Sequence, residues 1–153
     1  MNVQRFLHEH GTNFDVVEHQ PTFDSCHLAR SLSVPGRQLA KTVLLRASDG
    51  YRYALAVLPA THKVDLKKIG DILGPSVCLA SEDEVALHCR DCEVGALPPF
   101  GSQLGVETIM DETIASQERI VFEGNTHHEA ISMRYQDFYD LEHPLVTSFA
   151  VAS

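Results

Sequence analysis

Lys41 is the residue of this sequence whose type and position most plainly suit chemistry. It begins the apolar, β-branched run Thr42-Val43-Leu44-Leu45, which predicts a strand, so the lysine lies at the edge of an apolar core. An ammonium group there could polarise a carbonyl or hold a carboxylate or a phosphate. The alternative is a structural lysine whose stem packs on apolar surface while its charge stays in water.

A second candidate is a loop that carries two prolines between two glycines. Proline fixes φ and removes an amide donor, whereas glycine permits positive φ and a close approach of a ligand to the main chain. A stiff loop with exposed amides could bind an acyl group or an oxyanion, although an ordinary turn would have the same composition. The loop consists of Gly95, Ala96, Leu97, Pro98, Pro99, Phe100 and Gly101.

Two adjacent histidines, His127 and His128, follow the turn Gly124-Asn125-Thr126. One of them could face a pocket and orient a substrate hydroxyl or a water molecule. Exposed turn histidines with no role in binding are the alternative.

The cysteines give a weaker signal for chemistry. Cys89 and Cys92 form one Cys-x-x-Cys pair, but no second pair completes the four ligands of a structural zinc site, and a thioredoxin-like context is missing. Thiols stay reduced in the cytoplasm. We therefore predict no bound zinc, no other metal or cofactor, and no disulfide between Cys89 and Cys92. A metal or redox protein built on this pair stays as an alternative.

The elements that must position these residues follow from periodicity and from turn residues. Five helices are predicted. The first covers 2–10, and the second follows the caps at 22–25 and has Leu28, Ala29 and Leu32 on one face. The third covers 66–73 and is capped by Asp65, the fourth follows the capping box of Ser81 and Glu84, and the fifth begins at Asp137. Strands are predicted at 14–17, 41–46, 51–58, 77–80, 107–110, 119–122 and 129–135. Hairpins among the strands favour an α+β fold with a mixed sheet over a doubly wound parallel sheet.

Composition and charge limit the class of protein. The 153 residues are 44% hydrophobic and 22% charged, which predicts one globular domain over residues 1–153. We expect a cytoplasmic protein without a membrane partner, because the sequence contains neither a secretory signal nor an apolar run of membrane-spanning length.

The net charge of −9 argues against strong non-specific binding to nucleic acid, so any phosphate-binding surface must be a local cluster. The candidates are Arg37, Lys63, Lys67 and Lys68. Residues 63 and 67 are four apart and would share a face if the helix began that early. The alternative is a solvated helix face.

Three motifs occur in order: the strand led by Lys41, the Gly-x-x-Pro-Pro-Phe-Gly loop and the Gly-Asn-x-His-His turn. Together they resemble the YbaK / prolyl-tRNA-synthetase-associated editing domain family, over nearly the whole chain. The resemblance implies a strongly curved, barrel-like mixed sheet with surrounding helices. It also implies metal-independent hydrolysis of the ester between an amino acid and the terminal adenosine of tRNA.

In that family the essential lysine corresponds to Lys41, and the backbone of the proline-containing loop holds the aminoacyl group. Some relatives have asparagine where Thr42 stands, so this position bears on amino-acid preference. The implied substrate is a misacylated tRNA, such as tRNA for proline carrying alanine, cysteine or another small amino acid, and an aminoacyl-tRNA synthetase is a candidate partner. The alternative is a non-catalytic module that binds aminoacyl-adenosine or docks on a synthetase.

Overall fold

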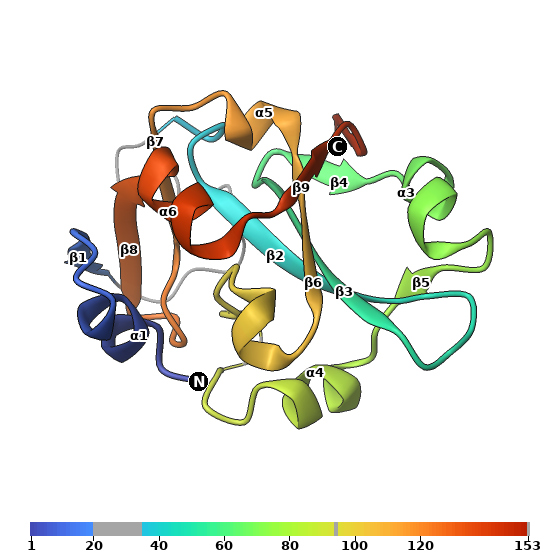
Figure 1. Cartoon of the computed structure of the whole chain (residues 1–153), viewed down its shortest axis with the longest axis horizontal. Helices are drawn as coiled ribbons and strands as arrows, with labels where there is room; N and C mark the ends of the chain where they lie inside the picture. Colours follow the sequence, from blue (N-terminus) through green and yellow to red (C-terminus); the bar gives the residue numbers. More distant parts are fainter. Residues whose placement is uncertain (20–34, 94, 153) are drawn as a thin grey trace.

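The computed structural model describes residues 1–19, 35–93 and 95–152 (Figure 1). The helix predicted after the caps at 22–25 lies outside the described residues. The described helices are α1 (Val3–Glu9), α3 (Leu66–Leu73), α4 (Glu82–His88), α5 (Glu112–Ala115), α6 (Tyr135–Glu142) and the 3-10 helix η1 (Gly101–Leu104). The strands are β1 (Asp15–Glu18), β2 (Ala40–Arg46), β3 (Tyr53–Pro59), β4 (His62–Val64), β5 (Cys78–Leu79), β6 (Glu107–Asp111), β7 (Arg119–Glu123), β8 (Glu129–Arg134), β9 (Leu145–Thr147) and β10 (Ala150–Ala152).

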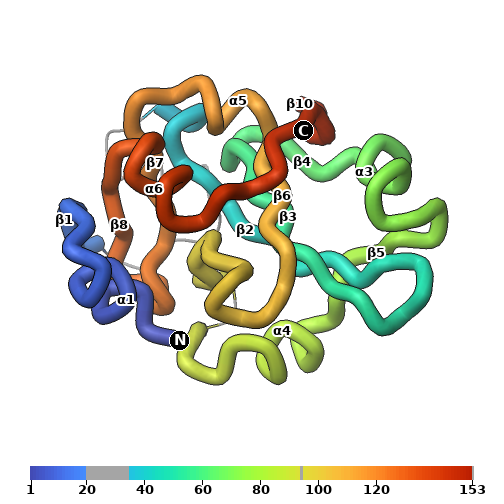
Figure 2. Tube along the Cα trace, viewed as in Figure 1, coloured from blue at the N-terminus to red at the C-terminus, as the bar shows by residue number. Residues whose placement is uncertain are grey.

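The largest sheet is mixed, with strand order β5-β2-β3-β6-β9. Strand β2 pairs antiparallel with β3 as the predicted hairpin, whereas β6 lies parallel to both β3 and β9. An antiparallel sheet of order β1-β8-β7 and the pair β10-β4 complete the described strands. Figure 2 shows β1 beside β8, although the two strands are far apart in the sequence. These elements confirm the predicted α+β class with a mixed sheet.

The expected barrel-like closure is not observed among the described residues, whose strands form three separate sheets. A single bridge, Leu39 to Val121, joins the β2 sheet to the β7 sheet, with the Val121 amide donating to the Gln38 carbonyl at 2.9 Å. The Gln38 amide also donates to the Pro35 carbonyl, so the chain turns before a longer ladder can form.

Strand β2 is buried on both faces. Leu45 packs on one face with Ile69 and Leu73 of α3, and Leu44 packs on the other face with Leu97.

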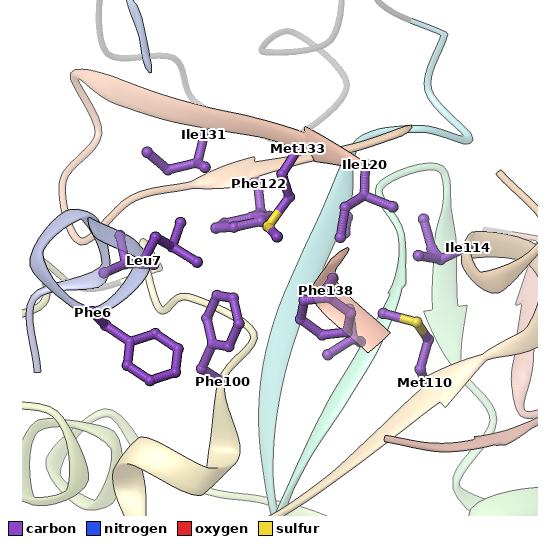
Figure 3. Packing of buried hydrophobic residues seen from close by; sticks show 13 residues of the cluster. Phe6, Leu7, Phe100, Met110, Ile114, Ile120, Phe122, Ile131, Met133 and Phe138 are labelled. Carbon is purple, nitrogen blue, oxygen red and sulfur yellow. The ribbon is translucent and has the colours of Figure 1, made fainter. Parts of the chain in front are cut away.

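Phe100 lies in the same apolar cluster as Ala40, and its ring contacts those of three further phenylalanines at centroid distances of 5.1 to 5.8 Å (Figure 3). The three are Phe6, Phe122 and Phe138. Loop 95–101 is therefore anchored in the core.

The predicted helix caps are confirmed at two positions. The Asp65 side chain accepts from the Lys67 and Lys68 amides, and Ser81 and Glu84 form the reciprocal capping box of α4. Helix α6 begins at Tyr135 rather than after Asp137, so that Tyr135 is not part of the preceding strand. The Tyr135 ring packs on residues three and four positions later, the spacing at which side chains meet on a helix, and these contacts favour the helix over a longer strand.

The prediction of separate thiols at Cys89 and Cys92 is wrong, because the two are joined in a disulfide with their Cα atoms 5.6 Å apart. Cys89 is the C-cap residue of α4, and the turn that follows brings Cys92 back to it. Neither the redox compartment nor the number of zinc ligands decides this local geometry. In the part of the chain that the structure describes, Cys78 is a free cysteine and no cluster of three metal-ligating side chains occurs.

None of the described helices combines the length and the apolar character that crossing a membrane requires.

Candidate active site

A hollow of about 210 Å³ lies at one edge of β2 and is called the edge hollow below. Its walls come from β2, from the segment that runs from β5 into α4, and from loop 95–101. The lining residues are Thr42, Val43, Leu44, Leu79, Ala80, Glu82, Val85, Gly95 and Leu97. The structure thus brings together Thr42 and the start of the loop, which the sequence places more than fifty positions apart.

The edge hollow exists because β5 covers only one end of β2. The two strands pair at Leu45 and Arg46, after which the Ala80 amide donates to the Leu44 carbonyl at 2.9 Å and the chain leaves into α4. Backbone groups of a strand alternate between its two edges. Since the Leu44 carbonyl points to the β5 side, the amide and carbonyl of Thr42 point to the same side, into the edge hollow.

The Thr42 hydroxyl adds a side-chain group to this wall. Its Oγ1 atom is buried and has no hydrogen-bond partner in the described structure. Buried polar groups in folded proteins nearly always have a partner, and leaving one unsatisfied costs about 1–3 kcal/mol. A ligand with a polar group would satisfy this hydroxyl.

Loop 95–101 crosses the face of β2 that carries Thr42. Leu97 packs with Leu44, and Phe100 lies in the cluster of Ala40, so the loop spans the residues on either side of Thr42. Pro98 and Pro99 are buried. The two prolines restrict the backbone of the loop, and this restriction helps to hold the loop in place across β2.

The two ends of the loop have different roles. The Gly101 amide donates to Thr108 Oγ1 at 2.9 Å, and a Cβ atom on Gly101 would lie 2.5 Å from that oxygen, so this end anchors the loop. The Ala96 amide donates to the Glu93 carbonyl. No described hydrogen bond uses the amides of Gly95, Leu97 and Phe100. Of these residues, Gly95 and Leu97 line the edge hollow, so their amides are the candidate donors to a ligand, whereas the Gly101 amide is taken by Thr108.

Lys41 precedes Thr42 in β2, pairs with Leu58 and is partly buried. Side chains of a strand alternate, so Lys41 leaves the strand on the face of Val43 and Leu45, and it is not among the described residues that line the edge hollow. Val43 shares that face and borders the edge hollow, so the Lys41 ammonium would approach the hollow along this face of β2. A role for Lys41 stays a prediction.

His127 is the histidine that meets the loop. A Cβ atom on Gly95 would lie 3.3 Å from Cε1 and 3.5 Å from Nε2 of the His127 ring, and Gly95 has a φ of +85°. A side chain at Gly95 would be strained and would press on the imidazole. His128 is exposed and lines a different hollow, together with Glu18, His19 and Glu129.

Main-chain hydrogen bonds join the histidine turn to the loop. The Glu93 amide donates to the Asn125 carbonyl at 2.8 Å, and the Asn125 amide donates to the Ala96 carbonyl at 3.1 Å. Asn125 is buried and adopts a positive φ of 74°, which asparagine tolerates better than most residues. Sequence reasoning named the turn but missed Asn125, whose position after Gly124 was the available signal.

The candidate tRNA-binding residues Arg37, Lys63, Lys67 and Lys68 are all exposed. Helix α3 begins at Leu66, and Lys63 belongs to β4, so residues 63 and 67 do not share a helix face. The remaining helical pair consists of Lys67 and Lys68.

Glu84 fixes α4, the helix that walls the edge hollow. Its carboxylate accepts from the Ser81 amide and the Tyr53 hydroxyl and lies 3.3 Å from the Arg46 guanidinium. The Ser81 and Tyr53 hydrogen bonds, aided by the positive charge of Arg46, lower the pKa of Glu84 from 4.5 to about 2.

We expect a carboxyl titration by NMR to place the pKa of Glu84 well below the ordinary value, and Tyr53→Phe to move it upward. A depressed pKa stabilises the fold at pH values above about 4.5, and this contribution is lost as the pH falls toward about 2. A Glu84 pKa at the ordinary value, or one that Tyr53→Phe leaves unchanged, would contradict the assignment.

Comparison with known proteins identifies the class of this domain. The family model for the aminoacyl-tRNA editing domain matches residues 19–141, and this chain belongs to that family. Among curated proteins, the prolyl-tRNA editing protein ProX of Acetoanaerobium sticklandii is 24% identical over 136 residues, which are 86% of this chain and 82% of that protein.

A segment of the proline–tRNA ligase of Bacillus cytotoxicus is 31% identical over 86 residues, which are 56% of this chain but 15% of the ligase. The fold matches a crystal structure of a proposed trans-editing enzyme for prolyl tRNA synthetase, with a TM-score of 0.85 and 20% identity over 98% of this chain and 95% of that one. At that identity the structural match establishes the shared fold.

Proposed function

We propose that residues 1–153 form one domain that acts as a trans-editing aminoacyl-tRNA deacylase in the cytoplasm. It hydrolyses the ester of a misacylated tRNA, with tRNA for proline carrying alanine, cysteine or another small amino acid as the preferred substrate class. Family membership and the names of the two curated relatives support this proposal. The observation that carries it is the buried, unpartnered Thr42 hydroxyl in the edge hollow.

The size and the chemistry of the edge hollow support a small aminoacyl group. Its volume is about 210 Å³, and most of its walls are apolar, with Leu79, Val85 and Leu97 among them. One methylene in such a pocket changes binding by about 1–3 kcal/mol, so the hollow can disfavour larger side chains.

The proposed mechanism uses positioning and charge stabilisation. An ester is already activated relative to an amide, so a water molecule held by the neighbouring ribose hydroxyl can attack the acyl carbon without a covalent enzyme intermediate. The ester bond breaks, and the water's proton passes to the departing ribose oxygen, which gives free amino acid and deacylated tRNA. The Thr42 and Gly95 amides hold the acyl group and its developing oxyanion, and His127 orients the neighbouring ribose hydroxyl. The Lys41 ammonium polarises the carbonyl or holds the phosphate of the terminal adenosine. The proposed reaction needs no metal and no cofactor.

A deacylation screen tests the function. Purified protein is incubated with tRNA for proline charged with alanine, cysteine or proline, and the remaining ester is measured over time. Faster loss of ester from the misacylated tRNAs than from prolyl-tRNA supports the proposal. Tight binding without hydrolysis would show a non-catalytic binding module instead, and activity that appears only with prolyl-tRNA synthetase present would identify a required partner.

Charge reversal at Lys67→Glu and Lys68→Glu tests the tRNA-binding surface. We expect weaker binding of tRNA, because both ammonium groups are exposed and each can contact one phosphate. The slope of log K against log salt concentration should become less steep by about one for each lysine removed. Binding is measured by fluorescence anisotropy across a salt series. Hydrolysis of aminoacyl-adenosine should barely change, because that substrate does not reach α3.

Arg5→Glu is the matched control, because Arg5 is exposed on α1 and lies outside this set. Equal loss on tRNA and on aminoacyl-adenosine would mean that α3 supports the edge hollow. If neither tRNA binding nor hydrolysis of aminoacyl-adenosine decreases, tRNA binds at another surface of the protein.

A further inference from the structure

Glu123 is a partly buried carboxylate that the proposed mechanism does not use. It is the last residue of β7, and its side chain is 16% exposed. The His127 Nδ1 atom lies 3.2 Å from Glu123 Oε1 and 3.1 Å from Oε2. Both carboxylate oxygens are therefore directed at one imidazole nitrogen.

The surroundings of Glu123 make this contact the main compensation for its burial. Burial raises the pKa of Glu123, whereas the hydrogen bond and the charge of His127 and the charge of His19 lower it, and Glu93 raises it again. A desolvated carboxylate needs a positive or hydrogen-bonding partner. In the described structure that partner is His127.

The contact fixes both the tautomer and the direction of the ring. When Nδ1 donates to a carboxylate, Nε2 becomes the basic nitrogen at the opposite end of the imidazole. The Cε1–Nε2 edge of His127 is the edge that lies against Gly95, a lining residue of the edge hollow. The His127 amide donates to Glu93 Oε2 at 3.1 Å, so the main chain of this residue is held as well.

We infer that Glu123 is a positioning residue for deacylation, because it holds the His127 imidazole against Gly95 at the rim of the edge hollow. The inference rests on the proposed function and adds to it a carboxylate–histidine contact beside the edge hollow. Glu123 acts through His127 and does not touch the acyl group itself.

Glu123→Ala should lower kcat/KM for a misacylated tRNA by about 10- to 100-fold, since a displacement near 1 Å of a positioned group has effects of that size. Glu123→Gln should restore most of the activity, because its side-chain oxygen still accepts from Nδ1. Glu118→Ala, which removes an exposed carboxylate just before β7, is the matched control and should leave activity unchanged. In a His127→Ala background, Glu123→Ala should cause no further loss.

The tautomer of His127 is measured separately by long-range ¹⁵N–¹H NMR of the imidazole, which needs no substrate. The expected result is a proton on Nδ1 in the native protein and a shift toward the Nε2-protonated form in Glu123→Ala. An unchanged tautomer, or additive losses in the double variant, would overturn the inference. If the native protein hydrolyses no ester, the proposed function fails, while the tautomer result still decides whether Glu123 positions His127.

Discussion

Replacing Lys41 by alanine should lower deacylation by about 100-fold or more while the protein stays folded. Loss of a charge that acts only in the transition state lowers kcat and kcat/KM together. Lys41 lies one residue before Thr42, at the part of β2 whose outer edge β5 leaves open. Steady-state kinetics on a misacylated tRNA measures the effect, and thermal unfolding of the same sample measures the fold.

Two variants complete this experiment. Lys41→Arg keeps the charge but changes its shape, and it should recover part of the activity only if charge alone is needed. Arg5→Ala, which removes an exposed cation of α1, should be silent. Near-full activity of Lys41→Ala would make this lysine structural and would leave the amides of Thr42 and Gly95 to carry the reaction.

Asp111→Asn should destabilise the protein by about 2–4 kcal/mol, the cost of losing charged hydrogen bonds at a buried site. Asp111 ends β6 and is 1% exposed. Its Oδ1 accepts from the Phe149 and Ala150 amides at 2.9 Å, and its Oδ2 accepts from the amide and hydroxyl of Thr113. Asparagine would point an NH₂ group at two of these donors. Urea unfolding measures the change.

The destabilisation should depend on pH with a defined sign. Burial raises the pKa of Asp111, but the Thr113 hydroxyl and the backbone amides outweigh this effect and hold it below the ordinary value. The stability that the carboxylate contributes is therefore present above the unfolded-state pKa and is lost as the pH falls through the folded-state pKa. The difference in the free energy of unfolding between the native protein and Asp111→Asn should therefore become smaller at acidic pH.

Asp140→Asn changes an exposed carboxylate on α6 and should lower the free energy of unfolding only slightly. A loss at Asp111→Asn no larger than that of this control would show that the C-terminal strands are held without the carboxylate.

Local signals in the sequence predicted the elements that depend on local physics. The caps of Asp65 and Ser81 marked α3 and α4, and the neighbouring strand patterns at 41–46 and 51–58 marked the β2–β3 hairpin. Parallel pairing of β3 with β6 carries no such signal, because the partners are far apart and the pairing depends on the whole sheet. The short strands β9 and β10 were missed for the same reason.

The candidate site was predictable by type but not by geometry. Residue chemistry and family resemblance named Lys41, Thr42, loop 95–101 and the two histidines. Only the folded structure shows that the Gly101 amide donates to Thr108 and that His127 rather than His128 lies against Gly95. Glu123 was not predicted, because a glutamate at a strand end is ordinary until a partner four residues later is seen to turn back to it.

The pairing of β1 with β8 sets an order of assembly for the chain. Asp15 pairs with Ser132, so this sheet cannot form until most of the polypeptide exists, whereas the β2–β3 hairpin needs only neighbouring residues. Non-local pairing slows folding and leaves strands unpaired for longer. All four residues of β1 are exposed, and both its ends, Asp15 and Glu18, are acidic. These negative charges repel the same strand of a second chain, and they therefore disfavour intermolecular pairing of β1 before β8 is available.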